Sequence, residues 1–160
     1  MKNAATLLVL TATLFGSSIA SAETLFIPAA EGVRDQPNSL CFDPVIPTGE
    51  MQIVGGANCM VSYPLHLPTG KTIDAVEIAY RYQSIGTPSI TAYVAQNRLK
   101  PNLGAIAVAG ASAQPKVGAG QELYLSIPAI SVPVVSGSTY WVQIFDTDVQ
   151  TISYVEVSYH

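Results

Sequence analysis

The chain has 160 residues, and only 11% of them are Asp, Glu, Lys or Arg, against about 25% in a typical soluble domain. Its formal net charge is −4 and no two basic residues are adjacent, so nucleic acid and anionic membranes are poor candidate partners. The surface must instead be covered by Ser, Thr, Gly, Ala, Gln and Tyr. Such a surface suits a secreted β domain or a subunit that packs against copies of itself.

The N-terminal segment, residues 1–22, has the three parts of a secretory signal peptide. Lys2 gives a positive start, residues 4–19 are apolar apart from Thr, Ser and Gly, and Ala20-Ser21-Ala22 has the small residues of a cleavage site. The apolar stretch is too short for a membrane span, and no second one follows it. We therefore expect a bacterial protein that is secreted, to the periplasm or outside the cell, with Glu23 as its first mature residue.

The remainder, residues 23–160, shows apolar and polar residues alternating with a period of two, and no segment keeps a 3.6-residue period. Strands are expected at Thr24–Ile27, Leu40–Phe42, Met51–Val54, Cys59–Leu67, Val76–Tyr82, Ile90–Ala95, Ala105–Ala109, Leu123–Ile127, Ile130–Val135, Tyr140–Phe145 and Ile152–Tyr159. Turn sequences such as Pro68-Thr69-Gly70 and Ser136-Gly137-Ser138 separate them. The pattern predicts a single all-β domain, an antiparallel two-sheet β-sandwich.

Cys41 and Cys59 are the two cysteines. Because an exported chain meets an oxidising compartment, we expect them to form a disulfide. Closing a loop of this size would stabilise the fold by about 3 kcal/mol. Metal binding is the lesser interpretation, since two thiols alone make an incomplete site.

Residues suited to catalysis are few. His66 and His160 are the only histidines, and no nucleophile elbow, phosphate loop or Cys-x-x-Cys sequence occurs. Asp146 and Asp148 are weak candidates for a metal site, because two carboxylates fall short of the about six to eight ligands of Ca²⁺. We interpret their segment as a solvated loop and predict a protein without catalytic activity and without a cofactor.

Aromatic residues are the stronger binding candidates. Tyrosines occur on most of the expected strands, and Trp141 is the single tryptophan. Aromatic rings stack on the C–H faces of sugars, although most of these tyrosines are expected to be structural. If strands 140–145 and 152–159 form a hairpin with their aliphatic rows inward, Trp141, Phe145 and Tyr154 make one outward aromatic patch. The alternative is that Trp141 is a core residue.

The sequence Gly137-Ser138-Thr139-Tyr140-Trp141-Val142 resembles a late strand of the jelly-roll β-sandwich domains found in bacterial secreted and surface proteins. The segment Leu67–Val76 is similar to an early strand entry of the same domains. The resemblance implies a jelly-roll-like sandwich, with carbohydrate binding or surface assembly as common uses. It transfers no catalytic residue.

A second resemblance is to fimbrial subunits, which end in alternating apolar residues and a penultimate Tyr, as Val155, Val157 and Tyr159 do here. In that family, one subunit's strand completes another's sheet. The close spacing of the cysteines and the lack of a Gly at the start of the C-terminal strand depart from the family pattern.

Taken together, these features indicate a non-catalytic exported domain. We expect first a structural subunit that self-associates through its charge-poor surface and an exposed sheet edge. The first alternative is a carbohydrate-binding module that presents aromatic residues to a surface glycan. The second is a fimbrial-type subunit that exchanges donor strands.

The signal peptide generates a direct prediction. Mass spectrometry of exported protein should give an N-terminus at Glu23, because cleavage follows the small-residue site. A mature form that keeps residues 7–14 would contradict it.

Overall fold

The computed structural model describes residues 21–34, 42–45, 49–53, 59–82, 89–98, 106–113, 120–146 and 150–160. The expected signal peptide lies almost entirely outside these residues, as do Cys41 and Asp148. The side chains of Cys59 and Asp146 are outside them too. Signal cleavage and the disulfide therefore stay predictions.

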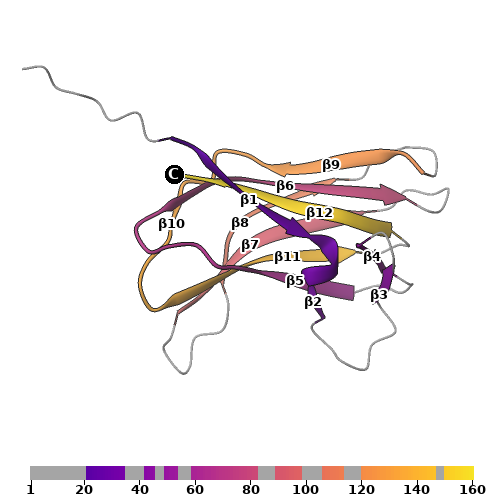
Figure 1. The fold of residues 1–160 in the computed structure, drawn as a ribbon, viewed down its shortest axis with the longest axis horizontal. Coiled ribbons are helices and arrows are strands. Elements are labelled where there is room, and N and C mark those ends of the chain that lie inside the picture. The colour runs from indigo at the N-terminus through magenta and orange to yellow at the C-terminus, as the bar shows by residue number, and fades with distance from the viewer. Residues whose placement is uncertain are drawn as a thin grey trace, which may run out of the picture.

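Two antiparallel sheets pack face to face (Figure 1). One has seven strands: β10 (Val132–Pro133), β6 (Thr72–Tyr82), β12 (Gln150–Tyr159), β4 (Glu50–Ile53) and β3 (Phe42–Val45) in that order, with β1 (Glu23–Pro28) paired to β12 and β9 (Glu122–Ile127) to β6. The other, of five strands, has the order β2 (Val33–Arg34), β5 (Cys59–Leu65), β11 (Ser138–Asp146), β7 (Ile90–Arg98) and β8 (Ile106–Ala113). A short 3₁₀ helix, η1 (Ala29–Glu31), lies between β1 and β2. The predicted all-β, two-sheet, jelly-roll-like sandwich is confirmed.

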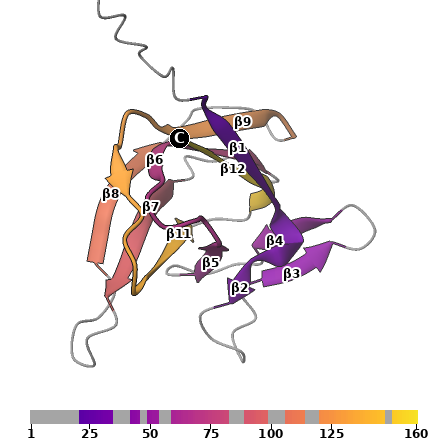
Figure 2. The same ribbon diagram turned by 60° about the vertical axis from the view of Figure 1, so that its left-hand side comes forward.

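The core lies between the two sheets. Figure 2 shows β1, β12, β6 and β9 on one side of it and β5, β11 and β7 on the other. Every second residue of the central strands points inward, as the pleat of a strand requires. The inward residues include Val76, Ile78 and Tyr80 of β6 and Tyr140, Val142 and Ile144 of β11, all no more than 2% exposed.

The strand expected at residues 130–135 is reduced to the two residues of β10. Ala129 has a φ of 52° and Ser131 a φ of 45°, and this left-handed conformation interrupts an extended strand. Backbone hydrogen bonds to β6 and to the residue before it hold this segment instead. The N–H of Ile130 donates to the carbonyl of Asp74, and the N–H of Val134 donates to the carbonyl of Lys71. Val132 and Val134 are still buried.

The predicted hairpin of residues 140–145 and 152–159 is wrong. β11 pairs with β5 and β7, whereas β12 pairs with β1, β4 and β6 in the other sheet. Both strands carry a fully buried aliphatic row. In a sandwich, two such rows face each other across the core, so the chain crosses from one sheet to the other between them.

A β-bulge in β12 sets the direction of its side chains. Ile152 and Val155 are both fully buried, although an odd spacing would place them on opposite faces of a regular strand. The register shifts between Ile152 and Tyr154, and the extra residue, Ser153, absorbs the difference. Tyr154 is thereby turned to the outer face while its apolar neighbours stay in the core.

The hydroxyl of Tyr140 in β11 joins β7 to β10 and to the residues just after β10. It donates to the carbonyl of Pro133 at 2.8 Å, and it accepts from the N–H of Val135 at 3.1 Å and from Nε2 of Gln96 at 2.9 Å. Tyr140 and Gln96 are 2% and 7% exposed. Water cannot easily replace these bonds, so the hydroxyl fixes the border of the sandwich where β7 ends and β11 begins.

This network predicts that Tyr140→Phe lowers the free energy of unfolding by about 1–3 kcal/mol, because buried donors lose their acceptor. Urea denaturation measures the change. Tyr124→Phe is the matched control: the hydroxyl of Tyr124 donates to the exposed Glu122, so its loss should change stability by about 0.5 kcal/mol or less. Equal stability of Tyr140→Phe and the wild type would contradict the role of the hydroxyl.

Candidate functional site

The outer face of the five-stranded sheet carries an aromatic cluster that we call the Trp141 face: Trp141, Gln143 and Phe145 of β11, Tyr93 of β7 and Ser62 of β5. The register places Ser62 and Tyr93 opposite Gln143, one on each side. Trp141 and Phe145 are four residues apart, about 13 Å along the strand. The aromatic rings thus surround a polar centre, and all five side chains are partly exposed.

Contacts hold the Trp141 face together. The rings of Tyr93 and Phe145 meet edge to face, with centroids 5.6 Å apart, a favourable arrangement. Nε2 of Gln143 donates to Oγ of Ser62 at 3.5 Å, a long hydrogen bond. Ala95, opposite Trp141, is only 1% exposed although it points outward, so larger side chains cover this part of the sheet.

A groove of about 430 Å³ continues the face past Tyr93. It is lined by Thr91 and Tyr93 of β7 and by residues 107–112 of β8. Gly110 lies opposite Tyr93, and a Cβ on Gly110 would come within 2.5 Å of the Tyr93 ring. The small residues of β8 therefore make room for the tyrosine ring and form the floor of the groove.

Among the described outward side chains of β5, β7 and β11, none is charged. The face offers aromatic rings, an amide and hydroxyl groups. These groups suit an uncharged ligand that has both C–H surfaces and hydroxyls.

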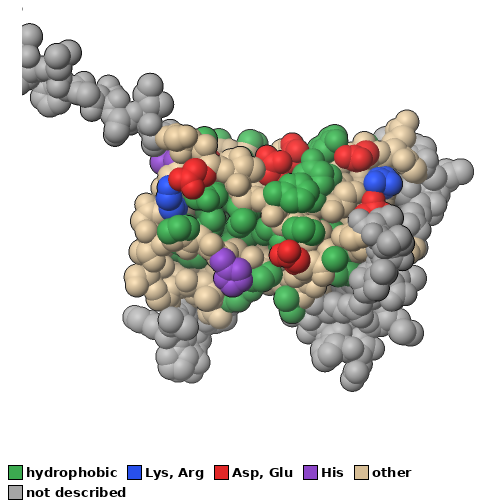
Figure 3. All heavy atoms as spheres, viewed as in Figure 1, with side chains coloured by type: hydrophobic (Ala, Val, Ile, Leu, Met, Phe, Trp, Pro, Cys, Tyr) green, Lys and Arg blue, Asp and Glu red, His purple; other side chains and the backbone are tan. Residues whose placement is uncertain are grey.

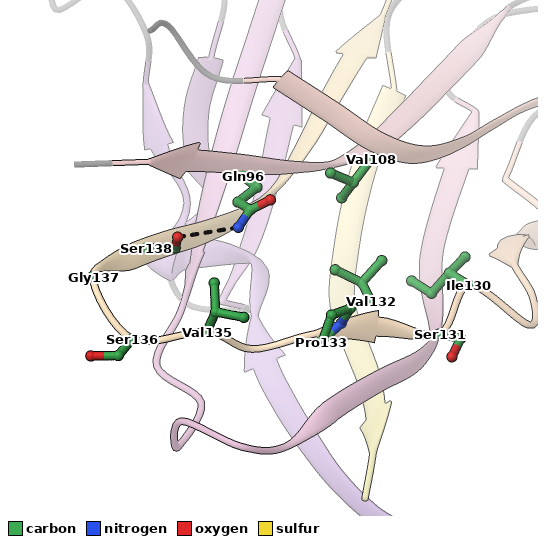
Figure 4. A pocket seen from close by; sticks show the side chains of 10 residues that line it. All are labelled: Gln96, Val108, Ile130, Ser131, Val132, Pro133, Val135, Ser136, Gly137 and Ser138. Carbon is green, nitrogen blue, oxygen red and sulfur yellow. Dashed lines mark hydrogen bonds between the residues drawn. The ribbon is translucent and has the colours of Figure 1, made fainter. Parts of the chain in front are cut away.

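A second hollow, of about 600 Å³, lies between β8 and the segment from Ile130 to Ser138. Val132 and Val135 point from one wall toward Val108 on the other (Figure 4). At one end, Nε2 of Gln96 donates to Oγ of Ser138 at 3.1 Å. The described side chains lining this cleft include no aromatic ring and no charge.

Two of the three predicted aromatic residues, Trp141 and Phe145, share a face, but Tyr154 does not. Tyr154 lies on the outer face of the seven-stranded sheet, where its ring centroid is 4.8 Å from that of Phe26. The single patch is therefore wrong, because β11 and β12 belong to different sheets. The alternative that placed Trp141 in the core is also wrong, since the inner row of β11 is Tyr140, Val142 and Ile144.

Tyr93 was the residue that sequence reasoning missed. It alternates with buried Ala92 and Val94, so its outward direction was readable from the pattern. Its place beside Gln143 was not, because strand pairing decides it.

A metal site or a histidine-based site has no support among the described residues. Within the described residues, no group of three or more His, Cys, Asp or Glu is placed to hold a metal ion. His160 lies with Nδ1 2.8 Å from Oδ2 of Asp74 at the surface, and His66 is exposed. In the part of the chain that is described, no helix is long and apolar enough to cross a membrane.

No protein-family model matches the chain, and no curated protein sequence does. Solved structures match it by fold. The xylan-binding module CBM15 is 10% identical over 86% of this chain and 97% of its own, with a TM-score of 0.60. The CBM22-1–GH10 modules of Clostridium thermocellum xylanase 10B, in complex with xylohexaose, are 13% identical over 86% of this chain and 27% of theirs, with a TM-score of 0.55.

A third similar structure is the CBM36-1 domain of a multidomain xylanase from the hindgut metagenome of Trinervitermes trinervoides. It is 9% identical over 84% of this chain and 96% of its own, with a TM-score of 0.51. The chain thus spans nearly all of two modules and about a quarter of the xylanase 10B chain. Identities this low speak for the fold alone: the chain shares the jelly-roll β-sandwich architecture of carbohydrate-binding modules.

Proposed function

We propose that this protein is a non-catalytic carbohydrate-binding module and that the Trp141 face binds the glycan. One observation carries the proposal: Trp141, Tyr93 and Phe145 present partly exposed rings around the uncharged polar side chains of Gln143 and Ser62. Each aromatic ring can stack on the apolar face of a sugar. The amide and the hydroxyl can bond the sugar's hydroxyl groups.

The shape of the face favours a polysaccharide over a single sugar. Aromatic rings at both ends of a stretch of about 13 Å, with a third beside its middle, offer contacts to several consecutive sugar rings. The groove beside Tyr93, about 430 Å³, extends this surface across β8 and gives the polysaccharide a shallow place to lie. Since no described side chain on the face is charged, the polysaccharide should be neutral.

The similar structures support this choice at the level of fold. Two of them are modules named for xylan or taken from a xylanase, and the third was solved with xylohexaose. Xylan is therefore the first polysaccharide to test, and the analogy is one of architecture, not of residues.

Self-association is the second candidate, and β8 is the observation that favours it. β8 is the last strand in the order of its sheet, carries no charged residue, and leaves Ile106 and Val108 45% and 36% exposed. Such an edge can pair with another strand. Donor-strand exchange has less support, because β12, which ends at Tyr159, is already paired with strands of its own chain on both sides.

The glycan proposal predicts that Trp141→Ala weakens binding to xylohexaose by at least about tenfold, as expected when a large aromatic contact is lost from a binding face. Isothermal titration calorimetry measures the affinity after a glycan array has tested other neutral polysaccharides. The variant should stay folded by circular dichroism, because Trp141 lies outside the core. Tyr154→Ala, on the opposite face, is the control and should bind as the wild type does.

Two results would count against the proposal. If the wild-type protein bound no glycan on the array, the proposed function would be wrong. If glycan binding survived in Trp141→Ala but was lost in Tyr154→Ala, the glycan site would lie on the seven-stranded sheet instead.

The groove gives a separate prediction. Gly110→Ala should displace the Tyr93 ring and lower the free energy of unfolding by about 1–3 kcal/mol, as overpacking does. It should also weaken glycan binding while leaving Trp141 in place. Ser112→Ala, on the same exposed strand, is the control for stability. If Gly110→Ala left both the unfolding midpoint and the glycan affinity unchanged, Tyr93 would have no part in the site.

A further inference from the structure

The outer face of the seven-stranded sheet holds a second aromatic cluster, on the opposite side of the sandwich from the Trp141 face. Two adjacent rows of residues cross β1, β12, β6 and β9. The pairing gives the first row as Phe26, Glu156, Glu77 and Ser126, and the second as Pro28, Tyr154, Ala79 and Tyr124. We call these two rows the Tyr154 face. Figure 3 shows hydrophobic side chains gathered on this side of the molecule, with acidic ones beside them.

The aromatic part of the Tyr154 face is open to solvent. Phe26 is 56% exposed and Tyr124 is 54% exposed, which makes them two of the most exposed large apolar side chains among the described residues. The ring of Tyr154 packs against Phe26 at 4.8 Å. Between Tyr154 and Tyr124 lies Ala79, which is fully buried. An exposed apolar patch of this kind marks a surface where a partner binds.

The acidic part is arranged unfavourably for the isolated protein. Glu77 and Glu156 lie directly opposite each other on neighbouring strands, and like charges in that position repel. In the described structure neither carboxylate forms an ion pair. Burial, the largest cause, and the nearby charges of Glu77, Glu156 and Glu122 raise the pKa of Tyr154.

The nearby cations are already engaged. Arg81 places Nη2 2.6 Å from Oε1 of Glu50 and Nε 3.9 Å from Oε2 of Glu122. Lys71, at the other end of the sheet, bonds Glu23. The face therefore presents two glutamates beside three aromatic rings, without a described cation that neutralises them.

We propose that the Tyr154 face docks a partner polypeptide through an arginine side chain, whose guanidinium lies between Glu77 and Glu156 and against the rings of Phe26 and Tyr154. A guanidinium is planar, so it stacks on aromatic rings while its N–H groups donate to carboxylates. Its charge also removes the repulsion between the two glutamates, which a neutral sugar cannot do. The proposal is independent of the glycan site, because the two faces lie on opposite sides of the sandwich and can be occupied together.

The test uses a fluorescently labelled peptide of alternating arginine and glycine, with a peptide of citrulline and glycine as the neutral isostere. Fluorescence anisotropy should show the arginine peptide binding to the mature protein at least about tenfold more tightly than the citrulline peptide. Binding should weaken as salt is raised to about 0.15 M, as expected for an exposed charged site.

Variants locate the binding. Glu77→Gln and Tyr154→Ala should each weaken binding of the arginine peptide by at least about tenfold. Trp141→Ala should leave the affinity for this peptide unchanged. Glu31→Gln removes one charge from an exposed glutamate on η1 and is the control for net charge. Glu77→Gln should melt no lower than the wild type, because it relieves repulsion, so a loss of binding cannot be ascribed to unfolding.

Several outcomes would overturn the proposal. These are equal binding of the arginine and citrulline peptides, an equal loss in Glu31→Gln and Glu77→Gln, or no binding at low salt. Tighter binding of a glucosamine oligomer, lost in Tyr154→Ala, would assign the face to a cationic glycan instead.

Discussion

The bulge in β12 controls both the hydrophobic core and one outer face of the sandwich. This strand pairs with β1, β4 and β6, and its fully buried residues Ile152, Val155 and Val157 supply the middle of the core. A regular strand could not place Ile152 and Val155 on the same side. The bulge at Ser153 lets Ile152 and Val155 both point into the core and leaves Tyr154 on the outer face. One extra residue therefore fixes both the core and one candidate binding face.

The sandwich gives the molecule two outer faces of different chemistry. Because inward positions are apolar on both sheets, the alternate positions are free to carry function. On β11 and β7 they carry aromatic rings and uncharged polar groups, whereas on β12, β6 and β9 they carry aromatic rings and glutamates. Tyrosine and tryptophan serve both faces, but the neighbouring side chains decide which ligand each face favours: a neutral polysaccharide on one and a guanidinium on the other.

The border of the sandwich near β10 is held by polar contacts more than by strand pairing. Tyr140 and Gln96 bond each other and the backbone of Pro133 and Val135. The same segment contains the left-handed residues Ala129 and Ser131, each of which costs energy unless surrounding contacts enforce it. The backbone hydrogen bonds from Ile130 to Asp74 and from Val134 to Lys71 supply such contacts on either side of Ser131.

The fold class, the strands that form most of both sheets and the alternation of their side chains can be predicted from the sequence, because all three depend on a local period of two. The sequence put Trp141 and Phe145 in the same row of one strand and singled out Tyr154, but it left open whether that row faces outward or into the core. It could not tell that β11 and β12 belong to different sheets, since both carry the same buried aliphatic row and nothing local records the partner of a strand. Only the tertiary structure brought Tyr93 beside Gln143, and Phe26 and Tyr124 beside Tyr154, because pairing between strands distant in sequence decides which outward side chains meet.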